Sequence, residues 1–320
     1  MAALKTESFW YTSSAITIVL TRFNSSSVTP SRLILLSSSF SATIKSLEEV
    51  VSLGSDCVGI IAGLEKLDAD TLSCFPNLRV VSRLGSGVDN IDLEAAKQKG
   101  IVVRNTPYGP TRAAAELTLA MVMALLRNIP MADRNMRQGI WRKEIGQLLQ
   151  GRTVGILGLG RIGREVAQLM IAMGCTVIGH DLVPDIDWSA KHNVRLVDFP
   201  DLLLESEILC IHVSTLDDNA TLIGEKELAS MRPGAMLVNM ARGGIVDEDA
   251  LVAALKNETL KGAALDVYNH EPYTGPLTEI DTVVLTPHLG SYAKDAKLAM
   301  EIESVENLLE SLDKHKLAKV

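Results

Sequence analysis

The chain has 320 residues, of which 47% are hydrophobic and 22% are charged, and its formal net charge is −8. This length exceeds what one hydrophobic core usually supports, so two domains are expected. The composition excludes a fibrous or disordered protein, and the negative charge disfavours nucleic acid as a partner. No apolar run approaches the roughly 20 residues needed to cross a bilayer, so no membrane partner is expected.

The cysteines and the amino-terminal composition bear on the compartment. Cys57, Cys74, Cys175 and Cys210 are widely spaced and form no paired metal-ligand pattern, so we expect reduced thiols, no metal and a cytoplasmic protein. Residues 1–46 are Ser-rich and contain one acidic residue, Glu7, which is also the composition of some organelle transit peptides. Organellar targeting therefore stays open.

Short β-branched runs alternate with helical patterns in the first third of the chain. The strands expected there are 16–20, 33–36, 57–61, 79–82 and 101–103. Each is short and apolar enough to be a parallel strand buried on both faces, although the stretch 23–31 is short for a helix joining the first two. One long helix is expected over 111–127, opened by Pro110 and ended near Pro130.

The alternation of strand and helix is clearer after Gly151. The strands expected there are 154–157, 176–179, 195–197, 208–213, 235–239, 263–267 and 282–285. Helices are expected over 161–173, 224–231 and 247–256, with a closing helix over 293–312. Strand and helix in repeated order predict a doubly wound parallel sheet.

A glycine triplet opens the helix that follows the strand 154–157. Gly158 permits a tight turn, Gly160 lets the backbone approach a pyrophosphate, and Gly163 allows close packing of helix on strand. Asp181 ends the next strand, where a carboxylate accepts hydrogen bonds from the adenosine ribose and repels a 2′-phosphate, so NAD is favoured over NADP. The alternative is a packing turn with an unrelated aspartate.

The order of strands and helices along the chain predicts the domain organisation. The fold class expected is α/β, with two doubly wound parallel-sheet (Rossmann-like) domains. Residues 107–286 are expected to form an NAD-binding Rossmann domain, inserted into a discontinuous, flavodoxin-like substrate-binding domain of residues 1–106 and 287–320.

Three late residues match the needs of hydride transfer to a 2-oxo acid. Arg242 follows the strand 235–239, and its guanidinium is suited to a carboxylate. His288 follows the last strand and is the candidate proton donor, and Glu271 is the carboxylate that orients an imidazole and favours its protonated form. Taken singly, each is more often a surface or packing residue. His212 ends a strand and is expected to line the cofactor cleft without doing chemistry.

Several segments in order resemble the D-isomer-specific 2-hydroxyacid dehydrogenases, and within them the catalytic core of the phosphoglycerate dehydrogenases. They are RLGSGVDNID (83–92), NTP (105–107), AEL (115–117), GILGLGRIGRE (155–165), VNMARGGIVD (238–247), ALDV (264–267), EP (271–272) and PH (287–288). The resemblance covers about 76–309, more than two thirds of the chain.

The resemblance implies roles for particular positions. Arg242, Glu271 and His288 are the expected catalytic residues. The expected cofactor-binding residues are Gly158, Gly160, Arg161, Ile162, Gly163, Asp181, His212, Ala241, Asp266 and Gly290. The expected substrate-binding residues are Arg83, Ser86, Gly87, Val88, Arg242 and His288, with the amides of 86–88 holding the substrate carboxylate. The family is typically dimeric through 111–141, so a homodimer is expected.

The function expected is NAD-dependent hydride transfer between nicotinamide and a small D-2-hydroxy or 2-oxo acid. 3-Phosphoglycerate comes first among substrates because Arg83 suits a phosphate, and glyoxylate or hydroxypyruvate come next. Arg142 or Lys143 from a partner subunit is a further candidate for that phosphate, and solvated surface charge is the alternative. An NAD(H)-sensing, corepressor-like binding protein is the contrasting class, because such proteins keep the same residues. Formate dehydrogenase is disfavoured, since that relative carries glutamine where Glu271 stands.

Overall fold

The computed structural model describes residues 16–21, 33–37, 57–214 and 221–317. The chain divides into unit 1, Met1–Pro110 with Lys294–Val320, and unit 2, Thr111–Ala293. The sequence placed the two boundaries after residues 106 and 286. Because the second boundary lies after Ala293, unit 2 contains His288 together with Arg242 and Glu271.

Unit 2 is built on a sheet of seven parallel strands in the order β12-β11-β10-β9-β6-β7-β8. Its strands are β6 (Thr153–Leu157), β7 (Thr176–His180), β8 (Arg195–Leu196), β9 (Ile208–Ile211), β10 (Ala235–Asn239), β11 (Leu260–Leu265) and β12 (Val283–Leu285). The order reverses between β6 and β9, so a topological switch point lies at their carboxyl ends. Parallel-sheet proteins bind ligands at such a point.

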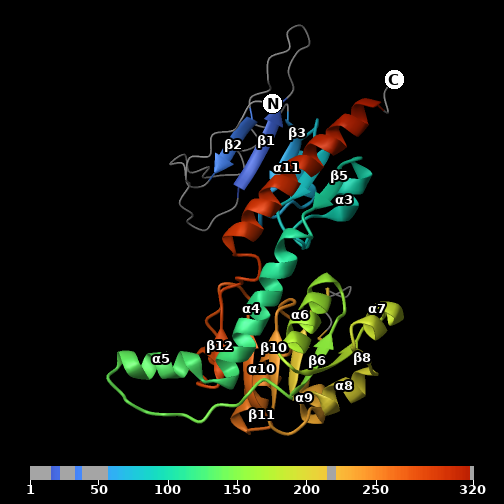
Figure 1. Ribbon diagram of the computed structural model, residues 1–320. Coiled ribbons are helices and arrows are strands. Elements are labelled where there is room, and N and C mark those ends of the chain that lie inside the picture. Colours follow the sequence, from blue (N-terminus) through green and yellow to red (C-terminus); the bar gives the residue numbers. More distant parts are fainter. Residues whose placement is uncertain (1–15, 22–32, 38–56, 215–220, 318–320) are drawn as a thin grey trace. The chain divides into compact units, whose positions relative to one another are not determined.

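Helices cover both faces of this sheet, as its apolar strands require (Figure 1). One buried cluster joins α4 (Gly109–Leu126) and α6 (Arg161–Ala172) to residues such as Ile156, Cys210 and Val238. The other face is covered by α8 (Phe199–Glu205), α9 (Glu225–Ser230) and α10 (Glu248–Lys256), which pack on Leu209, Leu237 and their neighbours. Helix α7 (Ile186–Lys191) and the 3₁₀ helix η2 (Pro276–Glu279) complete the described part of unit 2.

The sequence prediction for unit 2 missed one helix. The helix predicted over 111–127 is α4, but Pro130 does not simply end it, because a separate helix α5 (Ile129–Arg137) begins there. Asn128 adopts a left-handed conformation with φ +53°, which breaks the chain direction before Pro130 enters the first turn of α5. Proline fits a first helical turn because no hydrogen bond is lost there. No residue of α5 is buried.

Unit 1 contains a five-stranded sheet in the order β2-β1-β3-β4-β5. These strands are β1 (Ile16–Thr21), β2 (Leu33–Ser37), β3 (Cys57–Ala62), β4 (Val80–Arg83) and β5 (Val102–Asn105). Strands β3, β4 and β5 are parallel, whereas β1 runs antiparallel to both β2 and β3. The prediction that the first two strands are parallel is therefore wrong. An antiparallel pair needs no crossover helix, which agrees with the short stretch between them.

Helices α2 (Ala69–Ser73), α3 (Leu93–Gln98) and α11 (Lys294–Leu317) belong to unit 1. Helix α11 packs along β3, β4 and β5, where Leu308 joins Ile61 and Val80 in a buried cluster. The end of the chain thus completes the core of the unit that its beginning forms. Asp68 and Asp92 cap α2 and α3, each accepting a hydrogen bond from a first-turn amide.

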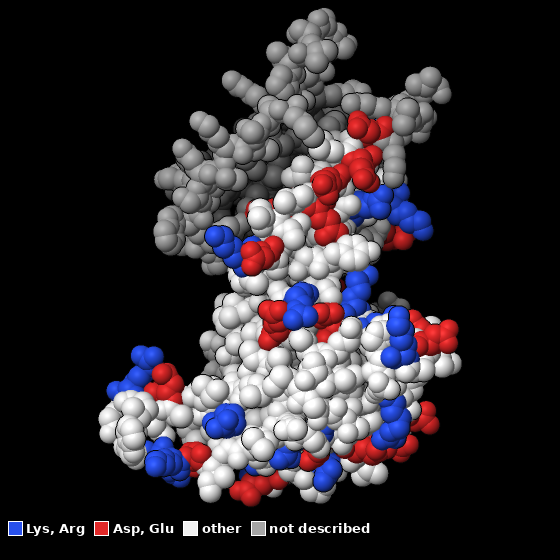
Figure 2. Space-filling view, in the orientation of Figure 1, with Lys and Arg blue, Asp and Glu red and all other residues white. Residues whose placement is uncertain are grey.

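The surface of unit 2 carries charges of both signs. Figure 2 shows Lys and Arg interspersed with Asp and Glu over its visible face. In the described part of the chain, no single helix is long and apolar enough to span a bilayer. Helices α4 and α5 taken together have that length and composition, but they are bent by 64° at the break between them.

Candidate active site

Candidate site residues follow six strands of the unit 2 sheet. Gly158 follows β6, Asp181 follows β7, His212 follows β9, Arg242 lies after β10, Asp266 follows β11 and Thr286 follows β12. Because all the strands are parallel, their carboxyl ends share one edge of the sheet. Chain folding therefore gathers residues that are more than a hundred positions apart along the sequence.

The glycine turn between β6 and α6 is shaped for a dinucleotide. Gly158 has φ +94°, and a Cβ there would lie 2.8 Å from the backbone of His212. A Cβ on Gly163 would lie 1.9 Å from the carbonyl oxygen of Gly158, so the helix packs directly on the turn. At Gly160 a Cβ would meet nothing within 4 Å. The amino-terminal turn of α6 therefore faces open space where a pyrophosphate can approach backbone amides.

Asp181 lies beside this turn at the end of β7. Its Oδ2 accepts a hydrogen bond of 2.7 Å from the amide of Leu159, and its Oδ1 accepts one of 2.9 Å from the amide of Val183. Arg164 Nε donates to the carbonyl of Leu159 at 2.8 Å and holds the same turn from the helix side. The carboxylate is thus fixed in the position from which it can accept hydrogen bonds from ribose hydroxyls.

His212 has two buried ring nitrogens without hydrogen-bond partners among the described residues. Burial lowers the pKa of this imidazole to about 3, so the ring is neutral near neutrality. Buried polar atoms are nearly always paired in folded proteins, and leaving one unpaired costs about 1–3 kcal/mol. The backbone of His212 packs against the glycine turn, and its imidazole has no partner among the described residues. This arrangement fits a site that receives a polar ligand. Together with Gly160 and Asp181, it makes this edge suitable for NAD.

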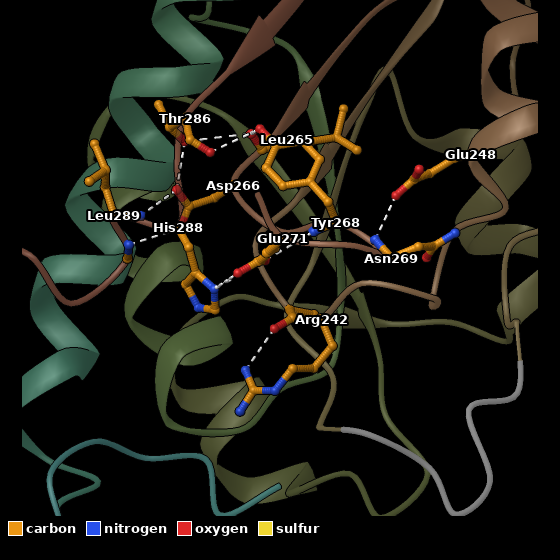
Figure 3. Close-up of polar contacts among 12 residues, drawn as sticks. Arg242, Glu248, Leu265, Asp266, Tyr268, Asn269, Glu271, Thr286, His288 and Leu289 are labelled. Atoms are coloured by element: carbon orange, nitrogen blue, oxygen red, sulfur yellow. Dashed lines mark hydrogen bonds and ion pairs between the residues drawn. The ribbon is translucent and has the colours of Figure 1, made fainter. Parts of the chain in front are cut away.

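Glu271 and His288 form a close pair (Figure 3). His288 Nδ1 lies 2.9 Å from Glu271 Oε2 and 3.2 Å from Oε1, and both side chains remain partly exposed, at 44% and 39%. His288 has φ +54°, a left-handed conformation that is uncommon outside glycine, asparagine, aspartate and histidine. With Nδ1 held by the carboxylate, Nε2 is the nitrogen available to a substrate.

Asp266 anchors the loop that carries His288. This carboxylate, 1% exposed, accepts hydrogen bonds from Thr286 Oγ1 at 2.6 Å, from the amide of Leu289 at 2.6 Å and from the amide of Gly290 at 2.8 Å. Burial raises the pKa of Asp266, while these donors and His288 oppose that shift. Asp266 therefore fixes the residues on both sides of His288.

Arg242 lies on a loop that is held by hydrogen bonds and close packing, like the loop of His288. Asn239, which is 2% exposed, accepts a hydrogen bond from the amide of Ala241 at 3.1 Å and donates one to the carbonyl of Arg242 at 3.1 Å. A Cβ on Gly243 would lie 1.9 Å from the carbonyl oxygen of Tyr268, so this loop packs against the one that leads to Glu271. In Figure 3 the guanidinium of Arg242 and the ring of His288 extend in the same direction from their loops.

The predicted substrate loop lies in unit 1, after β4. The amide of Gly85 donates to Thr106 Oγ1 at 2.7 Å, and Asn105 Nδ2 donates to the carbonyl of Ser86 at 2.7 Å. Arg83 Nη1 donates to the carbonyl of Leu84. The amides of residues 86–88 donate to no acceptor in the described part of the chain. The loop thus offers backbone donors of the kind that bind carboxylates.

The sequence predicted charged residues for a site in unit 2 but did not predict the residues that hold them in place. The structure brings Arg242, Glu271 and His288 into one unit, and it puts Arg161 and Ile162 in the first turn of α6. Asn239, Tyr268 and Thr286 were missed. The one sequence signal for Asn239 was a polar amide residue at the end of an apolar strand. Among the described residues, no group of His, Cys, Asp or Glu could hold a metal ion.

The comparisons with known proteins agree with this geometry. Residues 119–290 match the family described as D-isomer specific 2-hydroxyacid dehydrogenase, NAD binding domain. A D-3-phosphoglycerate dehydrogenase of Pongo abelii is 43% identical over 79% of this chain and 48% of its own length. This chain thus spans about half the length of the curated relatives it matches.

Solved structures share the fold. The TT0316 protein from Thermus thermophilus superposes with a TM-score of 0.78 at 34% identity, covering 83% of this chain and 86% of that one. A glyoxylate reductase from Paecilomyes thermophila gives a TM-score of 0.77 at 31% identity, covering 84% and 85%. A family model that matches more than half of the chain and structures that align along most of it lead to one conclusion. The chain belongs to the D-isomer-specific 2-hydroxyacid dehydrogenase family.

Proposed function

We propose that this protein is an NAD-dependent oxidoreductase that transfers hydride between the nicotinamide and C2 of a small D-2-hydroxy or 2-oxo acid. The observation that carries the proposal is the pair of His288 Nδ1 and Glu271 Oε2 at 2.9 Å, in the same unit as Arg242 and the glycine turn at Gly158. An imidazole oriented by a carboxylate is a general acid and base, and a guanidinium binds and polarises an oxo acid.

The bound cofactor supplies the hydride acceptor or donor, and the protein residues handle the proton and the charge. When a 2-oxo acid is reduced, His288 Nε2 gives a proton to the oxygen on C2, and in the reverse direction it takes that proton back. Glu271 holds the ring and stabilises its charged form. Arg242 attracts the negative charge of the substrate and of the developing alkoxide.

3-Phosphoglycerate is the substrate we propose first. The support is the 43% identity to a protein named D-3-phosphoglycerate dehydrogenase, together with Arg83 beside the loop of residues 86–88. In this proposal the amides of 86–88 hold the substrate carboxylate and Arg83 binds the phosphate. Glyoxylate and hydroxypyruvate are the second choice, supported by the likeness to a glyoxylate reductase.

A substrate panel tests the proposal. Purified protein is assayed with NADH and NADPH on glyoxylate, hydroxypyruvate, phosphohydroxypyruvate and pyruvate, and with NAD on 3-phosphoglycerate and D-lactate. We expect turnover with NADH or NAD, and the highest kcat/KM on the phosphorylated pair. Turnover on glyoxylate alone would make glyoxylate the proposed substrate in place of 3-phosphoglycerate, and the proposed hydride transfer would stand. NADH binding without any turnover would favour the NAD(H)-sensing class instead.

We further propose a homodimer formed through α5 and the segment after it. No residue of α5 is buried within the chain, and the helix extends from the rest of unit 2 in Figure 1. Trp141, Ile145 and Leu148, in the segment that follows, are 78%, 96% and 72% exposed. Such an apolar surface is typical of an interface. Light scattering after gel filtration tests the proposal, and Ile145→Glu with Leu148→Glu is expected to shift a dimer toward monomer.

A further inference from the structure

The hydroxyl group of Tyr268 lies at the base of the catalytic loops. Its oxygen is 2.9 Å from the carbonyl oxygen of Leu265 and 2.9 Å from that of Thr286 (Figure 3). Tyr268 is 8% exposed, so water does not readily replace these contacts. Burial also raises the pKa of this phenol, which keeps its proton in place. The two carbonyls share the single phenolic proton, so one buried donor links the ends of β11 and β12.

Each of these two carbonyls belongs to the support of the reacting histidine. The carbonyl of Thr286 also accepts a hydrogen bond of 3.0 Å from the amide of His288, so the phenol and the histidine backbone share one acceptor. Leu265 directly precedes Asp266, whose carboxylate holds the amides of Leu289 and Gly290. The hydroxyl thus sets the spacing between the strand end that carries Asp266 and the one that carries His288.

The backbone of Tyr268 contacts the other two catalytic loops. Its amide donates to Glu271 Oε1 at 3.2 Å, and its carbonyl oxygen lies where a Cβ on Gly243 would be 1.9 Å away. Glu271 is the partner of His288, and Gly243 follows Arg242. A displacement of Tyr268 therefore moves the carboxylate and the guanidinium as well as the imidazole.

We propose that the Tyr268 hydroxyl is a positioning group that keeps the imidazole of His288 in register with the carboxylate of Glu271. This inference rests on the proposed dehydrogenase function and adds a residue that acts through others. The phenol touches no reacting atom. Its ring packs at 4.6 Å from the ring of Tyr273, and a phenylalanine would keep that packing while removing the bridge between the carbonyls.

Tyr268→Phe is the test. We expect kcat/KM for the best 2-oxo acid to fall about tenfold, as for one lost buried hydrogen bond, while the Kd for NADH stays within twofold. The loss should appear in kcat more than in KM, because the substrate still binds while the proton donor is displaced. Hydrogen exchange of the peptide covering residues 285–291 should also become faster, and this readout needs no substrate.

Tyr273→Phe is the matched control, since it removes the hydroxyl of the ring stacked on Tyr268. That hydroxyl accepts only a 3.3 Å hydrogen bond from the amide of Leu277 among the described residues, and no change in kcat is expected. A Tyr268→Phe protein with the kcat and the exchange rates of the wild type would overturn the inference while leaving the proposed function intact. A wild type that turns over no 2-oxo acid would instead defeat the proposed function, and the exchange experiment would still report on the bridge.

Discussion

His288 Nδ1 lies 2.9 Å from Glu271 Oε2, although the two residues stand on loops that follow different strands of unit 2. Tyr268 contacts both loops, through its amide to Glu271 and through its hydroxyl to the carbonyl of Thr286. The acid and base function proposed here depends on this pairing, and the following predictions test the parts of the site separately.

Glu271→Gln removes the charge that stabilises the imidazolium and keeps the size of the side chain. We expect kcat for 2-oxo acid reduction to fall by about 10²-fold, within the range for general acid and base catalysis. Affinity for NADH, measured by fluorescence titration, should change less than twofold. A glutamine variant with wild-type kcat at every pH would show that the carboxylate does not assist the histidine.

Asp181→Ser removes the carboxylate at the end of β7. Loss of charged hydrogen bonds to the ribose is expected to weaken NADH by about 10-fold to 100-fold, since such bonds contribute about 1.5–3 kcal/mol. NADPH should bind better than before, because the repulsion of its 2′-phosphate is gone. Fluorescence titration with NADH and NADPH measures both affinities. An unchanged preference for NADH over NADPH would show that Asp181 does not bind the ribose.

Gly160→Ala and Gly163→Ala should affect different properties, NADH affinity and stability respectively. A Cβ at position 163 collides with the carbonyl of Gly158 at 1.9 Å, so we expect a loss of about 1–3 kcal/mol in the free energy of unfolding. A Cβ at position 160 meets no protein atom within 4 Å, so the fold should keep its stability while NADH binds more weakly. Equal effects of the two changes on denaturant unfolding and NADH affinity would contradict the fit described above.

His212→Phe tests the buried imidazole through pH. Burial lowers the pKa of His212 in the folded chain to about 3, below its unfolded value of 6.5, so the unfolded chain binds more protons between these values. Its contribution to stability is therefore full above pH 6.5 and is lost as the pH falls toward 3.

At pH 5 the penalty amounts to about 2 kcal/mol. The phenylalanine variant should therefore lose less Tm than the wild type between pH 7.5 and pH 5, and it should bind NADH more weakly. Cofactor-free thermal scans at both pH values provide the first measurement. His192→Phe is the control, because the ring of this half-buried histidine at the C-terminal end of α7 has a hydrogen-bond partner, the carbonyl of Trp188. Parallel Tm curves for wild type and His212→Phe would refute the assignment.

The sequence was most informative where strands are apolar and bounded by glycine. The strand predicted over 235–239 is β10 with the same bounds, and the glycine triplet lies at the turn between β6 and α6 as expected. Buried parallel strands have a composition that sequence alone reveals. The needs of hydride transfer pointed to Arg242, Glu271 and His288, and the family resemblance then implied their roles.

Other features depend on contacts that sequence periodicity does not encode. The direction of β1 is set by its partners, and an apolar run reads alike in either direction. Helix α5 was missed because its start depends on the left-handed Asn128. Nothing in the sequence distinguishes Tyr268, because the carbonyls of Leu265 and Thr286 meet its hydroxyl only in the folded chain.

The most direct test of the account is the rate of NADH oxidation by His288→Asn in the presence of the best 2-oxo acid. Asparagine suits this variant because it tolerates the left-handed backbone that His288 adopts at φ +54°. We predict a fall in kcat of about 10²-fold to 10⁴-fold with NADH affinity retained. A variant that binds NADH and turns over at the wild-type rate would contradict the central claim that this imidazole is the acid and base.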